Sequence, residues 1–121
     1  MTALFSLPSG FHAAVIGGAG DIGAAISNLL CDLGATVTAT AVDDAAISRS
    51  LLRPRAGLAM HKLDVTSDEA VDAFEKAHQR VDALVNDASI DAQPGLAWEI
   101  DEEHWRRLID VDLNGPWWCT K

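Results

Sequence analysis

The chain has 121 residues, of which 49% are hydrophobic and 22% charged, a composition typical of a folded domain. Its formal net charge is −9 and no lysine or arginine precedes Arg49, which argues against binding to nucleic acid or to an anionic membrane. No apolar stretch approaches the roughly 20 residues that cross a bilayer, and the N-terminus lacks a positively charged leader. Cys31 and Cys119 match no metal-ligand or redox spacing. We therefore expect one cytoplasmic domain over 1–121, without a metal, whose ligands are small.

Two apolar patterns alternate along the chain. Short runs of β-branched and small residues predict four strands, over 12–16, 36–42, 58–63 and 81–85. Helical spacing and capping residues predict helices over 21–33, over about 45–52, after the capping box at 66–69, and after Asp101. This alternation predicts an α/β fold, a doubly wound, Rossmann-like parallel sheet of about four strands with helices on both faces.

The segment GGAGDIG, residues 17–23, joins the first predicted strand to the first predicted helix. Gly17 lets the chain turn out of the strand, Gly20 lets the backbone approach a pyrophosphate, and Gly23 lets the helix pack closely on the sheet. The free N–H groups at the helix start would face the anion. Asp21 would repel a pyrophosphate unless its carboxylate caps the helix and points sideways. The loop therefore predicts a phosphate cradle for a dinucleotide.

Four segments together resemble the short-chain dehydrogenase/reductase family, in the family's order and spacing. VIGGAGDIG resembles its glycine turn, LDV its adenine-contacting segment, VDALVNDASI its strand ending in Asn-Asn-Ala-Gly, and DVDLNG its Val-Asn-Leu segment. The resemblance implies a Rossmann fold, an NAD(P) cofactor and the interconversion of an alcohol and a ketone. It implies cofactor contacts at these positions: Gly17, Gly20, Asp21, Ile22, Gly23, Asp64, Val65, Asn86, Ala88 and Ser89.

Several positions depart from the family's pattern. Asp87 and Ser89 stand where the family has Asn and Gly, and the serine Cβ would crowd the nicotinamide riboside. Asp112 stands at the position of the family's catalytic Asn, where an ionised carboxylate accepts hydrogen bonds but does not donate them. The family's catalytic Ser and Tyr-x-x-x-Lys lie further along, and this chain has no tyrosine. We therefore expect the N-terminal, cofactor-binding half of such an enzyme, truncated after the fourth strand–helix unit and inactive alone.

The end of the second predicted strand is where Rossmann domains distinguish NAD from NADP. Asp43 or Asp44 could bind the ribose 2′-hydroxyl, although capping of the next helix explains Asp43 almost as well. The family's acidic position aligns better with Ala41, and Val42 then replaces the arginine that favours NADP. Because the glycine loop carries no basic residue, NAD is weakly favoured over NADP.

A non-catalytic role is the alternative, in which a minimal Rossmann module binds a nucleotide or a partner protein and turns nothing over. Trp105, Trp117 and Trp118 are expected to pack helices or to cover an interface, because the acidic charge disfavours stacking on nucleic acid. In the family, the helix that starts near Asn114 joins a dimer interface, and Pro116 suits its first turn. A homo-oligomer formed through this C-terminal helix is therefore plausible.

Overall fold

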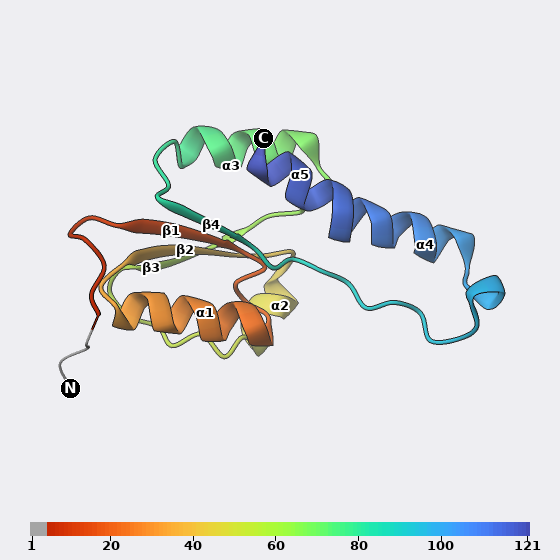
Figure 1. Cartoon of the computed structure of the whole chain (residues 1–121), viewed down its shortest axis with the longest axis horizontal. Helices are drawn as coiled ribbons and strands as arrows, with labels where there is room; N and C mark the ends of the chain where they lie inside the picture. Colours follow the sequence, from red (N-terminus) through yellow and green to blue (C-terminus); the bar gives the residue numbers. More distant parts are fainter. Residues whose placement is uncertain (1–4) are drawn as a thin grey trace.

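The computed structural model describes residues 5–121, which form one parallel sheet with helices on both faces (Figure 1). The sheet has four strands in the order β3-β2-β1-β4, with these bounds: β1 (His12–Ile16), β2 (Thr36–Ala41), β3 (Leu58–Lys62) and β4 (Ala83–Asn86). The register pairs Ala13 with Val37 on one side and with Ala83 on the other. The predicted α/β, doubly wound sheet is confirmed, and each strand lies within two residues of its predicted bounds.

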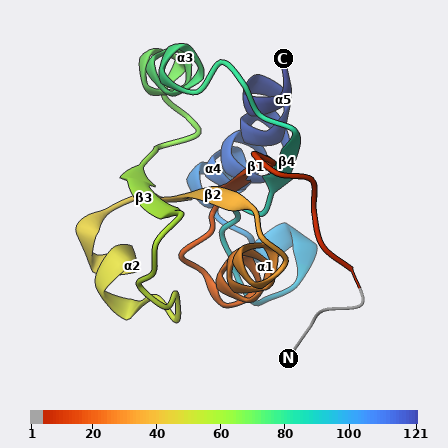
Figure 2. The same cartoon turned by 90° about the vertical axis from the view of Figure 1, so that its left-hand side faces the viewer.

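The helices form two layers, which the end-on view separates clearly (Figure 2). One face of the sheet carries α1 (Asp21–Asp32) and α2 (Asp44–Arg49). The other face carries α3 (Asp68–Ala77) and α5 (Gly115–Thr120), while α4 (Glu102–Ile109) extends beyond the edge of the sheet. A short 3₁₀ turn, η1 (Ala97–Glu99), lies in the long connection from β4 to α4. In residues 5–121, no helix has both the length and the apolar character needed to cross a membrane.

The central strand β1 is buried on both faces, as a strand covered by two helical layers must be. Ala13, Ala14, Val15 and Ile16 are each at most 1% exposed. The hydroxyl groups buried in β2 are satisfied by neighbouring polar groups, as buried polar groups generally require. Thr40 Oγ1 accepts a hydrogen bond from the Gly17 amide over 3.1 Å, which fastens the start of the glycine loop to β2.

The helix ends follow capping rules that the sequence displays. Asp43, Ser67 and Asp101 each accept a backbone N–H bond from the residue three positions later. Gly34, just beyond α1, has a φ of +96°, the left-handed conformation expected there. Helix α2 is shorter than predicted and ends at Arg49, because Ser50 is already extended.

The predicted helix near Asn114 is not a separate element. Helix α4, a π-helical turn η2 (Asp110–Asn114) and α5 form one continuous helix. In the π turn, the Gly115 amide bonds to the Asp110 carbonyl, five residues back. Pro116 follows directly, and a proline has no N–H to continue the α-helical pattern and clashes with the carbonyl four residues back. The wider turn accommodates this proline without ending the helix.

Candidate dinucleotide-binding site

Glycine is required at several positions of the loop between β1 and α1. Gly17 has a φ of +82°, and a Cβ on it would lie 2.5 Å from the Ala88 amide nitrogen. A Cβ on Gly23 would collide with the Gly17 carbonyl, so this glycine permits the close packing of α1. Gly18, which was not among the predicted site residues, packs against β2, and a Cβ on it would lie 2.7 Å from the Cβ of Ala39. Gly20 differs, since a Cβ there meets only the Gly17 carbonyl at 3.5 Å.

The loop is held by its own backbone hydrogen bonds and leaves the start of α1 free. The Ala19 amide bonds to the Thr40 carbonyl over 3.2 Å, and the Gly20 amide bonds to the Gly17 carbonyl over 3.1 Å. The first helical bond of α1 runs from the Ala24 amide to the Gly20 carbonyl over 2.7 Å. The amides of residues 21–23 precede that bond and so have no partner within the helix. Together with the helix dipole, they form an anion-binding end.

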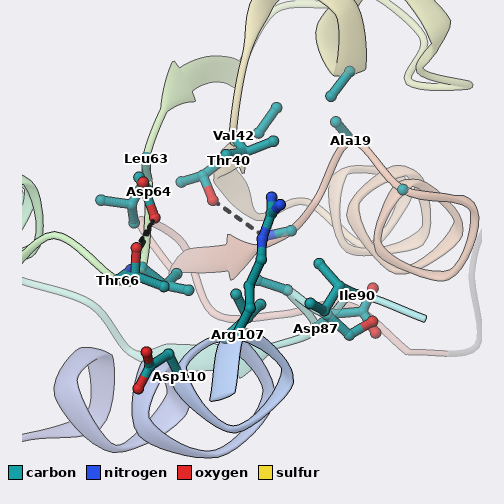
Figure 3. Close-up of a pocket in the computed structure, with 18 of the residues that line it drawn as sticks. Ala19, Thr40, Val42, Leu63, Asp64, Thr66, Asp87, Ile90, Arg107 and Asp110 are labelled. Carbon is teal, nitrogen blue, oxygen red and sulfur yellow. Dashed lines mark hydrogen bonds between the residues drawn. The ribbon is translucent and has the colours of Figure 1, made fainter. Parts of the chain in front are cut away.

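A cavity of about 790 Å³ lies beside these amides. It is at the carboxyl edge of the sheet, where the chain, having built β2 and β3 on one side of β1, places β4 on the other. This switch point is where open α/β sheets bind their ligands. The lining comes from the segments that follow the four strands, from the start of α1 and from α4. Figure 3 labels ten of the lining residues: Ala19, Thr40, Val42, Leu63, Asp64, Thr66, Asp87, Ile90, Arg107 and Asp110. A volume of this size suits a ligand larger than a single phosphate.

The segment after β3 supplies a fixed carboxylate and a buried apolar side chain. Asp64 Oδ1 accepts hydrogen bonds from the Thr66 amide over 2.9 Å and from Thr66 Oγ1 over 2.6 Å. Val65 is 5% exposed, and a Cβ on Gly115 would lie 2.6 Å from its Cγ2. Glycine at residue 115 therefore lets the helix pack directly on Val65, which also lines the cavity.

The segment after β4 is anchored to both neighbouring elements. The Asp87 amide bonds to the Ile16 carbonyl over 2.8 Å, which places Ala88 against Gly17. Asn86 Nδ2 donates to Thr120 Oγ1 over 3.0 Å. The Ile90 amide donates to Asp112 Oδ1 over 2.9 Å. These contacts fix the cavity wall from the side of α5 and η2.

Most of the predicted site residues lie together, and a few do not. Eight of them line the cavity: Gly17, Gly20, Asp21, Ile22, Asp64, Val65, Ala88 and Ser89. Four lie outside its lining: Gly23 beneath the loop, Asp43 at the start of α2, Asn86 toward α5, and Asp112 on η2. Asp21 does not cap α1, because Gly20 is the capping residue and no side chain bonds there. Its carboxylate therefore stays exposed at the mouth of the cavity.

One wall of the cavity was not predicted from the sequence. Helix α4 and the start of η2 contribute residues spaced three or four apart, which share a helix face: Glu103, Arg106, Arg107, Asp110 and Val111. The sequence predicts a helix after Asp101 but does not indicate which of its faces a ligand would meet. The signal for the face that lines the cavity is the charged i, i+3, i+4 and i+7 spacing, which also describes an ordinary solvent-facing surface.

A parallel sheet with a glycine turn at β1, free amides at α1 and a cavity at the switch point defines a Rossmann-type nucleotide-binding unit. Residues 12–121 match the profile described as short chain dehydrogenase. The chain belongs to this family.

Named relatives and a solved structure agree with this assignment. Chanoclavine-I dehydrogenase of Aspergillus fumigatus is 32% identical over 124 residues, covering 89% of this chain and 47% of the relative. Cis-4-hydroxycyclohexanecarboxylate dehydrogenase of Sinomonas cyclohexanicum is 34% identical over 115 residues, covering 90% and 46%. The structure of 3-ketoacyl-(acyl-carrier-protein) reductase from Brucella melitensis complexed with NADH has a TM-score of 0.83 at 25% identity, covering 93% of this chain and 48% of that one. The chain therefore spans about half the length of these relatives.

Proposed function

We propose that this chain binds an NAD(P) dinucleotide in the cavity beside α1 and does not reduce or oxidise substrates by itself. The observation that carries the proposal is the row of free amides at residues 21–23, which opens onto a cavity of about 790 Å³. Gly20 supports it, because the space where its Cβ would stand is open toward a ligand. The solved relative complexed with NADH has the same fold.

The lining residues suggest how the dinucleotide would lie. The amides of residues 21–23 would hold the pyrophosphate, and Asp64 with Val65 would face the adenine end. Ala88 and Ser89 would lie toward the nicotinamide riboside, where the Ser89 side chain takes space that glycine leaves open in the family. The bound nicotinamide would carry the hydride, and the protein's part is to orient it and to supply a proton.

These residues offer no side chain that could donate a proton to the substrate or accept one from it. The 121 residues contain no tyrosine, and none of the four histidines lines the cavity in the part of the chain that the structure describes. A positioned acid or base contributes roughly 10²–10⁴-fold to such reactions. We infer that alcohol–ketone interconversion belongs to a longer protein that carries the family's Ser and Tyr-x-x-x-Lys, and that the present chain supplies its cofactor-binding half.

NAD is the proposed preferred cofactor, because the glycine loop carries no lysine or arginine to hold a 2′-phosphate. The Asp43 carboxylate gives this preference less support than the sequence suggested. It accepts a hydrogen bond from the Ala46 amide over 2.7 Å and does not line the cavity.

Calorimetric titration with NAD and NADP tests binding, and a turnover assay with a panel of alcohols and ketones tests inactivity. We expect heat of binding at millimolar cofactor and no protein-dependent change in NADH absorbance. No heat with either cofactor would contradict the binding proposal. Steady NADH formation that scales with protein concentration would contradict the proposed inactivity.

A non-catalytic interaction module is the second candidate, favoured by apolar surface on the C-terminal helix. Trp117 and Trp118 are 63% and 38% exposed, and β4 is an edge strand whose Leu84 is 37% exposed. Self-association through this helix would cover those side chains. Sedimentation equilibrium of the chain and of its Trp117→Ser variant tests this, and a monomer at all concentrations would contradict it. The cytoplasmic location and the absence of nucleic-acid and membrane partners stay predictions.

A further inference from the structure

The cavity has an unusual charge for a site that would receive a diphosphate. Five carboxylates line it (Asp21, Asp64, Asp87, Glu103 and Asp110), against two guanidinium groups (Arg106 and Arg107). Carboxylates that line one cavity repel one another, and they repel a bound phosphate, unless a cation or solvent screens them. The free amides of α1 carry only a partial positive charge. A bound diphosphate therefore gains from any full cation that can reach it.

The two arginines differ in their contacts. Arg106 is paired on its own helix with Glu102, whose Oε1 lies 2.5 Å from Arg106 Nη2. Arg107 has no ion pair and no side-chain hydrogen bond to any residue within 5–121. Figure 3 shows its side chain rising from α4 into the middle of the cavity, toward Thr40 at the end of β2. Thr40 also binds the Gly17 amide, so Arg107 reaches toward the glycine loop.

The helix that carries Arg107 is fixed relative to the segments that follow β3 and β4. Asp112, five residues further along, accepts the Ile90 amide bond, and Gly115 packs against Val65. Ile90 and Val65 line the cavity, so both contacts attach this helix to the cavity wall from behind. The position from which Arg107 projects is therefore set by the fold, while within residues 5–121 no hydrogen-bonded or ionic partner of its side chain would have to be displaced.

We propose that Arg107 binds a phosphate group of the dinucleotide, opposite the amides of α1. This deepens the proposed function and rests on it. A guanidinium is suited to the role because its planar fork can hold two oxygens of one phosphate. A guanidinium could hold either of two phosphate groups: the pyrophosphate, which NAD and NADP share, or the 2′-phosphate, which NADP alone carries. Ala41 and Val42, at the end of β2, place no carboxylate there to oppose the latter.

The test compares Arg107→Gln with Arg80→Gln, which removes the same charge from an exposed residue outside the cavity lining. Calorimetry with NAD and NADP should give roughly tenfold weaker binding for Arg107→Gln and less than a twofold change for Arg80→Gln. Equal losses for both cofactors assign the contact to the pyrophosphate. A loss confined to NADP assigns it to the 2′-phosphate. Arg107→Lys should lose part of the affinity, because it keeps the charge without the fork.

A second measurement separates this inference from the proposed function. Inorganic pyrophosphate should raise the melting temperature of the unchanged protein and of Arg80→Gln, and raise that of Arg107→Gln less. If the unchanged protein binds a dinucleotide and Arg107→Gln binds it equally well, the inference is wrong and the proposed function stands. If pyrophosphate alone depends on Arg107, the phosphate contact stands without the dinucleotide function. If neither ligand binds the unchanged protein, both proposals fail.

Discussion

Asp112 Oδ1 accepts a hydrogen bond from the Ile90 amide over 2.9 Å, which joins the π turn η2 to the segment that follows β4. The family has Asn at this position, and a carboxylate can replace its accepting oxygen but not its donating nitrogen. Asp112 does not line the cavity, and its contact with Ile90 joins two parts of the fold. It holds together two segments that are 22 residues apart.

The first prediction concerns this bond. Asp112→Asn should keep the free energy of unfolding within about 0.5 kcal/mol, because the amide oxygen accepts the same bond, whereas Asp112→Ala should lower it by about 1 kcal/mol. Urea unfolding followed by circular dichroism measures both. Equal destabilisation of the two variants would show that the carboxylate charge, and not the accepting oxygen, matters.

The second prediction separates two glycines of the loop. Gly17→Ala should destabilise the fold by more than 2 kcal/mol, because it combines a positive φ with a Cβ that would lie 2.5 Å from the Ala88 backbone. Gly20→Ala should fold normally, since its φ is −71° and its nearest contact is at 3.5 Å. Its Cβ should nevertheless weaken NAD binding several-fold, because it occupies the approach to the α1 amides.

Thermal melts and NAD titrations on both variants provide the measurement. A Gly20→Ala protein that melts as low as Gly17→Ala would show that loop packing, and not ligand access, requires glycine at residue 20. Unchanged NAD affinity in a well-folded Gly20→Ala protein would remove Gly20 from the proposed site.

The sheet, the glycine loop and the part of the cavity lining that follows β1, β3 and β4 were predictable because they depend on local signals. Apolar runs and capping residues fix the strands and helices, and parallel strands bring their carboxyl ends to one edge. The face of α4 was not predictable, because its charged stripe matches an ordinary exposed surface. What turns Arg107 into the cavity is a set of tertiary contacts, such as Gly115 against Val65, that no local pattern encodes.

The π turn is an intermediate case. Pro116 indicates an irregularity in the helix, and the family resemblance predicted that a helix starts near it, at Asn114. A proline can be accommodated either by the start of a new helix or by a π turn within one helix. Which of the two forms depends on whether tertiary contacts hold the segments before and after the proline on one axis. Here the Ile90 bond to Asp112 and the packing of Gly115 on Val65 hold the π turn and the start of α5 in line with α4, so the helix continues.

The third prediction concerns pH and Cys31, which lies on the buried side of α1 and is 8% exposed. Burial raises the pKa of the Cys31 thiol above its usual value, and the Arg55 charge only partly opposes this shift. The folded state therefore holds the thiol proton more tightly than the unfolded state. The resulting stability is complete below the unfolded pKa of about 8.5 and is lost as the pH rises through the folded pKa.

Urea unfolding at pH 7.5 and pH 9.5 tests this. The stability loss between these two values should be smaller for Cys31→Ala than for the unchanged protein. Cys119, whose pKa is also raised by burial, acts in the same direction, so the Cys31→Ala/Cys119→Ala variant should lose least. Identical losses in all three proteins would contradict the prediction.

The last prediction separates the two roles considered for Asp43. Because Asp43 Oδ1 accepts the Ala46 amide bond, Asp43→Ala should cost about 1 kcal/mol of stability, while Asp43→Asn, which keeps a capping oxygen, should cost a few tenths. Neither change should alter the ratio of NAD to NADP affinity by more than about twofold, since Asp43 lies outside the cavity lining. A carboxylate bound to the ribose 2′-hydroxyl would behave differently, because both variants would then lose NAD affinity and gain NADP affinity together. Melting temperatures and parallel titrations with the two cofactors distinguish the cases, and a shift of the ratio toward NADP in Asp43→Asn, where the cap is intact, would return Asp43 to the cofactor site.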